Sequence, residues 1–418
     1  MMKPCTHTVL AALALPAVLF AVCSCSLFPG KTAVLWTDRS EFAFYAAEFN
    51  AVQDQYKIEV HYFDSPARKL ISSEEHPDIV AGTWLKSAST RVYFKSLDSF
   101  FGKDFSESAF YSRLLAIGSI DGTQFLLPVS FNIPALIFAR DKGELFSNPF
   151  TIGFAEMKRL GSDYNIEKDG VYTRIGFSPL WDDNFLFITA VLFKVAFQEA
   201  EPLAWNAAAL DRAMSFVYDW INEVNTGIQA EDDFYFKYFY EPPATLALSE
   251  RILFTYMGSD ELFTLPEERQ SSLDFRWIAE DNTIPLAESA VYLGLPKKGK
   301  APGAAAAFVR WFYQAETQRR LLERSKNTRA IETSFGISGG FSALRTVTEQ
   351  VFPRFYPSLL GHMPPEDFLS PANILPSNWT ALKERVILPY LRDRARSPDR
   401  SYVYPLEYRL IDWQKVNR

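Results

Sequence analysis

Residues 32–50 read TAVLWTDRSEFAFYAAEFN, and two periodicities meet in them. The short apolar run at 33–36 predicts a buried strand. Behind it, Phe42, Tyr45, Ala46 and Phe49 recur at the i, i+3, i+4, i+7 spacing of an amphipathic helix. A buried strand that runs directly into an amphipathic helix is the repeating unit of α/β folds.

The following segments continue this pattern. Residues 57–62, KIEVHY, alternate strictly and place Ile58, Val60 and Tyr62 on one face, which predicts a half-buried strand. Residues 79–81, IVA, predict a second fully buried strand. Strand, helix, strand and strand in this order favour an α/β layer with parallel pairing. Further strands are expected at 173–177, 252–256 and 291–295, and helices over 210–224 and from Pro302.

Length and composition limit the possible architectures and partners. A chain of 418 residues is too long for one compact core, so two lobes or domains are expected. The formal net charge is −7, and no stretch is strongly basic, which argues against a nucleic-acid partner. Aromatic residues make up 15% of the chain. Those at loop positions would suit ligands with flat apolar faces.

The N-terminus predicts export. Residues 9–22 carry no charge, and this run is shorter than the ~20 residues of a membrane-spanning helix but fits a secretory signal. The tetrad Val22-Cys23-Ser24-Cys25 resembles a bacterial lipobox, and no cysteine follows it. The resemblance implies that residues 1–24 are removed and that Cys25 carries a lipid anchor to a bacterial membrane, facing the periplasm. The alternative is an ordinary cleaved signal with Cys25 incidental.

Polar and aromatic residues follow the predicted strands. Ligands of open α/β sheets bind outside the carboxyl ends of the strands, so these loops are the candidate ligand site. Indole rings can cover the apolar face of a pyranose, while carboxylates, amides and hydroxyls match its hydroxyl groups. The candidate ligand-binding residues are Asp38, Arg39, Thr83, Trp84, Ser130, Asn132, Trp181, Asp182, Asp183, Gly258, Ser259 and Asp260.

Each candidate also has a structural alternative. Asp38 is placed to cap the helix that follows it, and Ser259 and Asp260 precede another helix. Trp84 and Trp181 are equally compatible with core positions. Their joint placement at strand ends supports a ligand site more strongly than any single residue does.

The order of segments resembles the solute-binding proteins of ABC transporters, in the sugar-binding group related to maltose-binding protein. The resemblance rests on VLWTDRSEFAFYAAEFN, PDIVAGTWL, DGTQFLLPVSFNIPALIFARD, RILFTYMGSDELF and AVYLGLPKKGKAPGAAAAFVRWFYQAETQRRLLE, within residues 33–325. It implies a type II periplasmic-binding-protein-like α/β fold, two lobes joined by crossing strands near 135–139 and 291–295, and a sugar held by lobe closure. From about residue 334 onward the chain departs from the family pattern.

The resemblance also implies a domain organisation and partners. We expect a signal peptide at 1–24, lobe 1 at 25–138 and 292–345, lobe 2 at 139–291, and a helical or irregular C-terminal segment at 346–418 that packs on the lobes. The expected partners are a small-molecule sugar, namely an oligosaccharide of unspecified identity, together with the permease subunits of an ABC importer and a lipid bilayer. A monomer without cofactor or metal is expected.

Enzymatic alternatives have weaker support in the sequence. Residues 336–340 fit G-x-S-x-G, but the polar segment before them is a poor strand and the only later histidine is His362. Asp182 and Asp183 are adjacent, so they point in opposite directions in an extended stretch and cannot form a facing glycosidase pair. The chain is therefore predicted not to be an enzyme. An exported enzyme or adhesin on the same scaffold, such as a carbohydrate-active hydrolase, remains the alternative.

Overall fold

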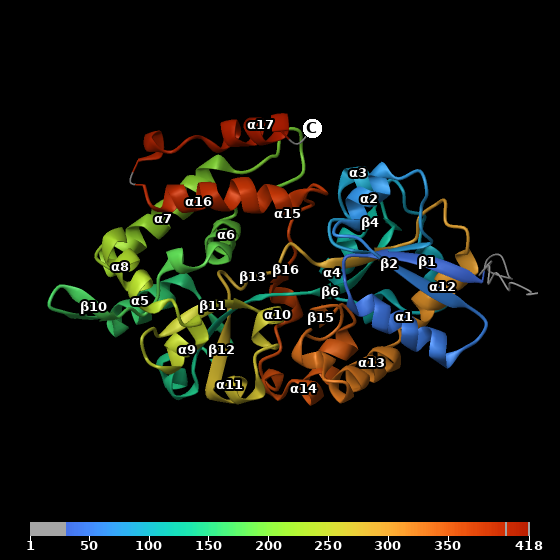
Figure 1. Cartoon of the computed structure of the whole chain (residues 1–418), viewed down its shortest axis with the longest axis horizontal. Coiled ribbons are helices and arrows are strands. Elements are labelled where there is room, and N and C mark those ends of the chain that lie inside the picture. Colours follow the sequence, from blue (N-terminus) through green and yellow to red (C-terminus); the bar gives the residue numbers. More distant parts are fainter. Residues whose placement is uncertain (1–30, 398, 417–418) are drawn as a thin grey trace, which may run out of the picture.

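Two β-sheets divide the chain into two lobes, which lie side by side in Figure 1. The computed structural model describes residues 31–397 and 399–416, so the predicted signal and Cys25 lie outside the described residues. The α/β class predicted from the sequence is confirmed. Of the described residues, none belongs to a helix long and apolar enough to span a membrane.

Lobe 1 contains a six-stranded sheet in the order β15-β6-β14-β3-β1-β2. Strand β1, next to the edge strand β2, pairs in parallel with β2 and β3, while β14 runs antiparallel to β3 and β6. Its strands are β1 (Thr32–Thr37), β2 (Lys57–Tyr62), β3 (Ile79–Gly82), β6 (Leu126–Phe131), β14 (Val291–Gly294) and β15 (Phe341–Ser342). Its helices are α1 (Glu41–Val52), α2 (Pro66–Ser72), α3 (Ala88–Arg91), α4 (Ser112–Ile117), α12 (Pro302–Phe312), α13 (Ala315–Asn327) and α14 (Phe352–Phe355), with a small hairpin of β4 (Ser119–Ile120) and β5 (Thr123–Gln124).

Helix α1 shows why the opening stretch of sequence determines this lobe. The predicted apolar face is buried at Phe42, Tyr45, Ala46 and Phe49. Its rings pack edge-on and tilted against rings of α12, such as Phe312, at centroid separations between 5.4 and 5.8 Å. The prediction of a strand followed by an amphipathic helix is confirmed.

Lobe 2 contains a four-stranded sheet in the order β11-β7-β12-β8. Its strands are β7 (Pro134–Ala139), β8 (Thr151–Ile152), β11 (Phe254–Gly258) and β12 (Leu273–Ile278). Its helices are α5 (Phe154–Tyr164), α6 (Asp183–Leu192), α7 (Ala207–Val224), α8 (Ile228–Tyr238), α9 (Pro243–Leu248), α10 (Ser259–Leu262) and α11 (Glu267–Ser272). A separate hairpin joins β9 (Ile166–Lys168) and β10 (Val171–Arg174).

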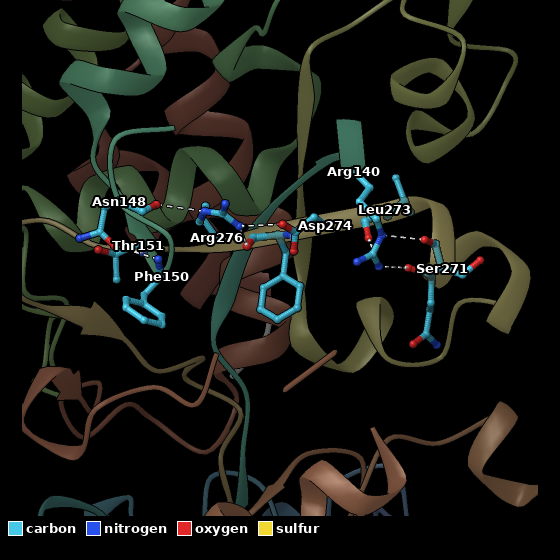
Figure 2. A network of polar contacts seen from close by, with 10 residues as sticks. Arg140, Asn148, Phe150, Thr151, Ser271, Leu273, Asp274 and Arg276 are labelled. Carbon is cyan, nitrogen blue, oxygen red and sulfur yellow. Dashed lines mark hydrogen bonds and ion pairs between the residues drawn. The ribbon is translucent and has the colours of Figure 1, made fainter. Parts of the chain in front are cut away.

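Two arginines fix the loops around the lobe 2 sheet (Figure 2). Arg276 is 5% exposed, and its guanidinium donates to Asp274 Oδ2 at 3.0 Å and to the Asn148 carbonyl at 3.0 Å. Arg140 donates to the Ser271 and Leu273 carbonyls at 2.7 and 2.9 Å. These charge-assisted hydrogen bonds tie β7 and β12 to the end of α11 and to the loop before β8, all at one end of the lobe 2 sheet.

The strand predicted at 173–177 differs from the structure. Strand β10 ends at Arg174 and pairs only with β9, so the prediction of a sheet strand here is wrong. The apolar residues that suggested a strand, Ile175 and Phe177, are buried at 0% and 2% exposure as irregular chain. Apolar character predicted burial here, but it did not determine which partner the segment would pair with.

Within residues 31–397 and 399–416, the chain crosses between the lobes three times. The first crossing is at residues 132–133, because β6 belongs to lobe 1 and β7 pairs with β11 and β12 in lobe 2. This crossing comes before the expected boundary at 138–139. The second crossing, residues 279–290, contains β13 (Ile284–Pro285), and the third contains β16 (Leu369–Ser370), which pairs in parallel with β13.

The C-terminal segment continues from the third crossing onto lobe 2. It forms α15 (Trp379–Leu382), a π-helical turn at Lys383–Ile387, α16 (Leu388–Ala395) and α17 (Leu406–Val416). Helix α16 packs on α6 and α7, and Figure 1 shows α15 pointing from lobe 2 toward lobe 1. The segment that departs from the family pattern in sequence therefore lies against the cleft between the lobes.

Candidate ligand-binding site

Two adjoining recesses form the cleft between the lobes. The hinge recess has a volume of about 150 Å³ and the outer recess about 400 Å³, and Ser289 of the second crossing lines both. The polar lining of the hinge recess includes Asn132, Asn184, Tyr256, Asp260, Glu261, Glu288, Ser289 and Lys383. The outer recess is lined by Asp38, Arg39, Tyr62, Asp64, Ser65, Arg68, Thr83, Trp84, Ser289, Ser377, Asn378, Thr380, Ala381, Glu384 and Arg385.

Predicted residues of both lobes reach these recesses. Asp38, Arg39, Thr83 and Trp84 line the outer recess from the ends of β1 and β3. Asn132, Gly258 and Asp260 line the hinge recess. The carboxyl ends of parallel strands meet at one sheet edge, which explains how sequence-distant loops converge here.

The Asp38 carboxylate is held in place by the loop after β3. The Thr83 backbone N–H and hydroxyl both donate to Asp38 Oδ2, at 3.2 and 2.7 Å. A Cβ on Gly82 would lie 2.7 Å from Asp38 Oδ1, so this close approach requires glycine. Arg39 Nε lies 3.6 Å from Asp38 Oδ1. The pair therefore forms a pre-arranged acid and guanidinium at the wall of the outer recess.

Trp84 connects the two sides of the cleft. Its backbone has φ +62°, its side chain is 8% exposed, and its indole N–H donates to Thr380 Oγ1 at 3.0 Å. Thr380 belongs to α15 of the C-terminal segment. Trp84 thus lies at the outer recess mainly as a buried contact between lobe 1 and α15, the core alternative anticipated from the sequence.

Ser130, Asn132 and Ser259 join elements around the first crossing. Ser259 donates through its hydroxyl to Asn132 Oδ1 at 2.7 Å, and Asn132 Nδ2 donates to the Gly339 carbonyl at 2.8 Å. Ser130 is 2% exposed and donates to the Ser338 carbonyl at 3.2 Å. Ser130 and Ser259 therefore stabilise the crossing, while Asn132 also lines the hinge recess.

Carboxylates gather on the lobe 2 side of the hinge recess. Partial burial raises the pKa of Asp260 above its usual range, and the pKa of Glu261 is raised by burial and by the nearby Asp260 and Asp182 carboxylates. The Tyr256 hydroxyl lies in the same negative field, and burial and these carboxylates keep its pKa well above its ordinary value. Together these groups offer a ligand both hydrogen-bond acceptors and a hydroxyl.

Trp181, Asp182 and Asp183 line neither of the two recesses. Trp181 packs against Phe234 and Phe239 at centroid separations of 5.9 and 4.7 Å. Asp182 caps α6 by accepting from the Asn184 N–H at 2.7 Å. Asp183 accepts two hydrogen bonds from Arg392 of α16, at 2.7 and 3.0 Å. Of the three, only Asp183 attaches the C-terminal segment to lobe 2, whereas Trp181 and Asp182 make contacts within lobe 2.

The C-terminal segment supplies a site residue that the sequence analysis missed. The Lys383 ammonium forms an ion pair with Glu288 of the second crossing, lies 3.2 Å from Asn184 Oδ1 and 4.3 Å from the centre of the Phe187 ring. It therefore ties the C-terminal segment to both α6 and the second crossing. No pattern in the sequence signalled this, because the segment lies beyond the resemblance.

Across residues 31–397 and 399–416, no group of three or more histidine, cysteine, aspartate or glutamate side chains is arranged to hold an ion. The recesses instead combine carboxylates, amides, hydroxyls and cationic side chains, the groups that recognise a polyhydroxylated ligand.

Solved structures place this fold in a recognisable class. A substrate-binding protein of an ABC transporter from Listeria monocytogenes, in complex with cycloalternan, superposes with TM-score 0.62 at 12% identity, covering 92% of this chain and 97% of that one. The sugar-binding protein MalE of Xanthomonas citri gives TM-score 0.62 at 10% identity, with 92% and 96% covered. The maltose/maltodextrin-binding domain of Bdellovibrio bacteriovorus bound to maltotriose gives 0.54 at 14%, with 93% and 100% covered.

The fold is therefore the two-lobed fold of MalE-like periplasmic binding proteins, as the sequence predicted. Comparison by sequence gives no such link, since no family model and no curated protein matches this chain.

Proposed function

We propose that this protein captures a carbohydrate in the cleft between its lobes and delivers it to an ABC importer. The observation that carries the proposal is the convergence of strand-end loops from both lobes on two adjoining polar recesses. Proteins with the same fold bind cycloalternan, maltotriose and mannotriose. We propose binding without turnover, and an oligosaccharide as the ligand.

The hydrolase alternative has little structural support. Ser338 of the G-x-S-x-G motif is 1% exposed and has φ +51° in a tight turn closed by hydrogen bonds between Ile337 and Gly340. Its backbone N–H donates to the Tyr45 hydroxyl at 2.9 Å. A nucleophile must reach its substrate, so this buried serine is not suited to the role.

A melting screen tests the proposal directly. Bound ligand raises stability by RT ln(1 + [L]/Kd), so the correct sugar raises Tm in a concentration-dependent way. The panel is maltotriose, mannotriose and cycloalternan, each followed by chromatography of the recovered sugar. Stabilisation with intact sugar supports capture, whereas release of shorter sugars supports the enzyme alternative. No shift with any saccharide would contradict the proposal.

The location at the membrane is a separate part of the proposal. We propose that the exported chain is anchored through a lipid on Cys25, which lies outside the described residues, and that it faces the periplasm and acts as a monomer. Two or more acyl chains on one residue would give stable anchoring. Cys25→Ser should be extractable without detergent and lack acyl label. A variant that stays acyl-labelled and membrane-bound would contradict the anchor.

A further inference from the structure

The amino-terminal end of the lobe 1 sheet lies opposite the cleft. Strands β1 and β3 run in parallel, and loops that follow their carboxyl ends line the outer recess. Strand β14 runs antiparallel to β3 and pairs its last residue, Gly294, with Val80, so the loop after β14 lies at the other end of the sheet. The Asp78 carboxylate accepts from the backbone N–H of Val34 at 2.9 Å and of Ala301 at 2.6 Å, which joins this loop to β1. Helix α12, which begins after the loop, lies on the side of lobe 1 away from lobe 2 (Figure 1).

A basic segment pairs with the loop after β14. The Lys95 N–H donates to the Leu295 carbonyl at 3.0 Å, and the Lys297 N–H donates to the Tyr93 carbonyl at 2.8 Å. The Lys297 ammonium also donates to the Val92 carbonyl at 2.9 Å. The two segments are thus held side by side, and their basic side chains share one end of the sheet.

Six basic side chains belong to this end of the sheet, which we name the basic edge. They are Lys57, Arg91, Lys95, Lys297, Lys298 and Lys300. Lys57 is included because it begins β2 and pairs with Thr32, the first residue of β1. Four of the six are exposed, and Arg91 and Lys95 are half-buried. Within the part of the chain that the structure describes, none of the six forms an ion pair, so their charges are available to a partner.

Acidic side chains at this end are fewer, and some are already engaged. Asp54 precedes β2, and Glu74 and Glu75 precede β3; all three are exposed. Both oxygens of the buried Asp78 accept backbone N–H groups, and those of Asp98 accept from a serine hydroxyl and a backbone N–H. The free acidic side chains are therefore half as many as the basic ones. This edge is positive although the net charge of the chain is −7.

The proposed lipid anchor would enter the fold at the same place. Strand β1 begins at Thr32, and Cys25 lies seven residues before it in the sequence. A fully extended chain of this length spans about 25 Å at most. A lipid on Cys25 would therefore keep the basic edge within about 25 Å of a bilayer.

We propose that the basic edge docks on the anionic headgroups of the bilayer that holds the anchor. The inference goes beyond sugar capture, and it rests on the export and lipid anchoring in the proposed function. Lysine and arginine side chains donate charge-assisted hydrogen bonds to lipid phosphates, and an anionic surface attracts them within a Debye length. A basic patch beside a lipid anchor gives a second attachment to the membrane. Because the edge lies opposite the cleft, docking there leaves both recesses uncovered.

Vesicle binding tests the basic edge in the absence of the lipid. The exported chain is prepared as Cys25→Ser, so that binding can come only from the protein surface. This parent chain is sedimented with vesicles of phosphatidylcholine alone and with vesicles of phosphatidylcholine mixed with phosphatidylglycerol. The same measurements are repeated at high salt.

Two triple variants of the parent chain remove equal charge from different places. The test variant carries Lys297→Gln, Lys298→Gln and Lys300→Gln. The control variant carries Lys168→Gln, Lys194→Gln and Lys237→Gln, at three exposed lysines of lobe 2. All six positions are exposed, and glutamine keeps an N–H donor for the Val92 carbonyl, so Tm should be unchanged in both variants.

The expected results depend on the charge of both surfaces. The parent chain should sediment with the anionic vesicles and not with the neutral ones, and high salt should release it. Release by salt also agrees with extraction of Cys25→Ser without detergent. The test variant should bind the anionic vesicles at least tenfold more weakly, since each lysine near such a surface strengthens binding about fivefold. The control variant should bind like the parent chain.

Contrary results distinguish this inference from the proposed function. Equal binding to neutral vesicles, or an equal loss in both triple variants, would overturn the inference, because binding would not then depend on the basic edge. Absence of binding to the anionic vesicles would also overturn it and would leave sugar capture and the anchor standing. Absence of an acyl label on the unaltered chain would instead contradict the anchor in the proposed function.

Discussion

Substitution of Thr380 by valine removes a hydrogen bond that spans the cleft. The Trp84 indole N–H donates to Thr380 Oγ1 at 3.0 Å, and the two residues belong to lobe 1 and to the C-terminal segment. Valine keeps the side-chain shape but has no acceptor, so the Trp84 N–H loses its partner. Thr380 itself is exposed, so little packing is lost.

Loss of this hydrogen bond in Thr380→Val should destabilise the closed state of the two lobes. A hydrogen bond of this kind contributes about 0.5–1.5 kcal/mol, which is a factor of about 2 to 13 in an equilibrium constant. Because the bond joins the two sides of the cleft, its loss should favour the open state and weaken ligand affinity by up to that factor. The folding of each lobe should be nearly unaffected.

Calorimetric titration with the saccharide identified in the melting screen measures the effect. Thr380→Ser keeps a hydroxyl and is the matched control, and it should bind like the unaltered chain. Trp84→Phe should produce a comparable loss, and the double variant should lose less than the sum of both, because they remove one shared bond. Full affinity in Thr380→Val, or losses that add in the double variant, would show that the Trp84–Thr380 hydrogen bond does not stabilise the closed state.

Three further predictions concern lobe 2. Trp181→Ala should lower the free energy of unfolding by ~3 kcal/mol and leave ligand affinity in the folded fraction unchanged. The reason is that Trp181 packs on Phe234 and Phe239 and lines neither recess. Lost affinity at unchanged Tm would contradict this prediction. Arg276→Met should cost about 1–3 kcal/mol in urea unfolding, because the hydrogen bonds to Asp274 and the Asn148 carbonyl are lost, whereas Arg159→Met, at an exposed ion pair, should cost little. Burial raises the pKa of Glu231 to about 7 from 4.5, so the folded state binds the proton more tightly than the unfolded state. The free energy of unfolding should therefore fall as pH rises from about 4.5 through 7, by ~3 kcal/mol in total. Urea titrations at several pH values should show this slope in the unaltered chain and its loss in Glu231→Gln.

The fold was predictable because local patterns and burial agree along lobe 1. The i, i+3, i+4, i+7 spacing from Phe42 to Phe49 determines which face of α1 packs on the sheet. The break at Pro134 separates two fully buried strands, β6 and β7, and marks the crossing between lobes. The strand expected before Trp181 failed, because apolar residues such as Phe177 can be buried without strand pairing.

The candidate site was predictable only where strand ends determine it. Asp38, Thr83 and Asp260 line the recesses because each follows a strand of a sheet. Lys383 was not predicted as a site residue, because it comes from a helical segment that attaches to lobe 2 by packing, and no local sequence pattern encodes this packing. Tyr62 was not predicted, because strand alternation indicates which face of the sheet a side chain lies on but not where the elements that cover this face end.

Sugar capture without turnover is tested by calorimetric titration of the unaltered chain with maltotriose, mannotriose and cycloalternan, followed by chromatography of the recovered sugar. We expect saturable heat for one site with at least one of these sugars, and recovery of that sugar intact. Absence of saturable heat with every one of them, or recovery of shortened products, would contradict the proposed capture of a sugar without turnover.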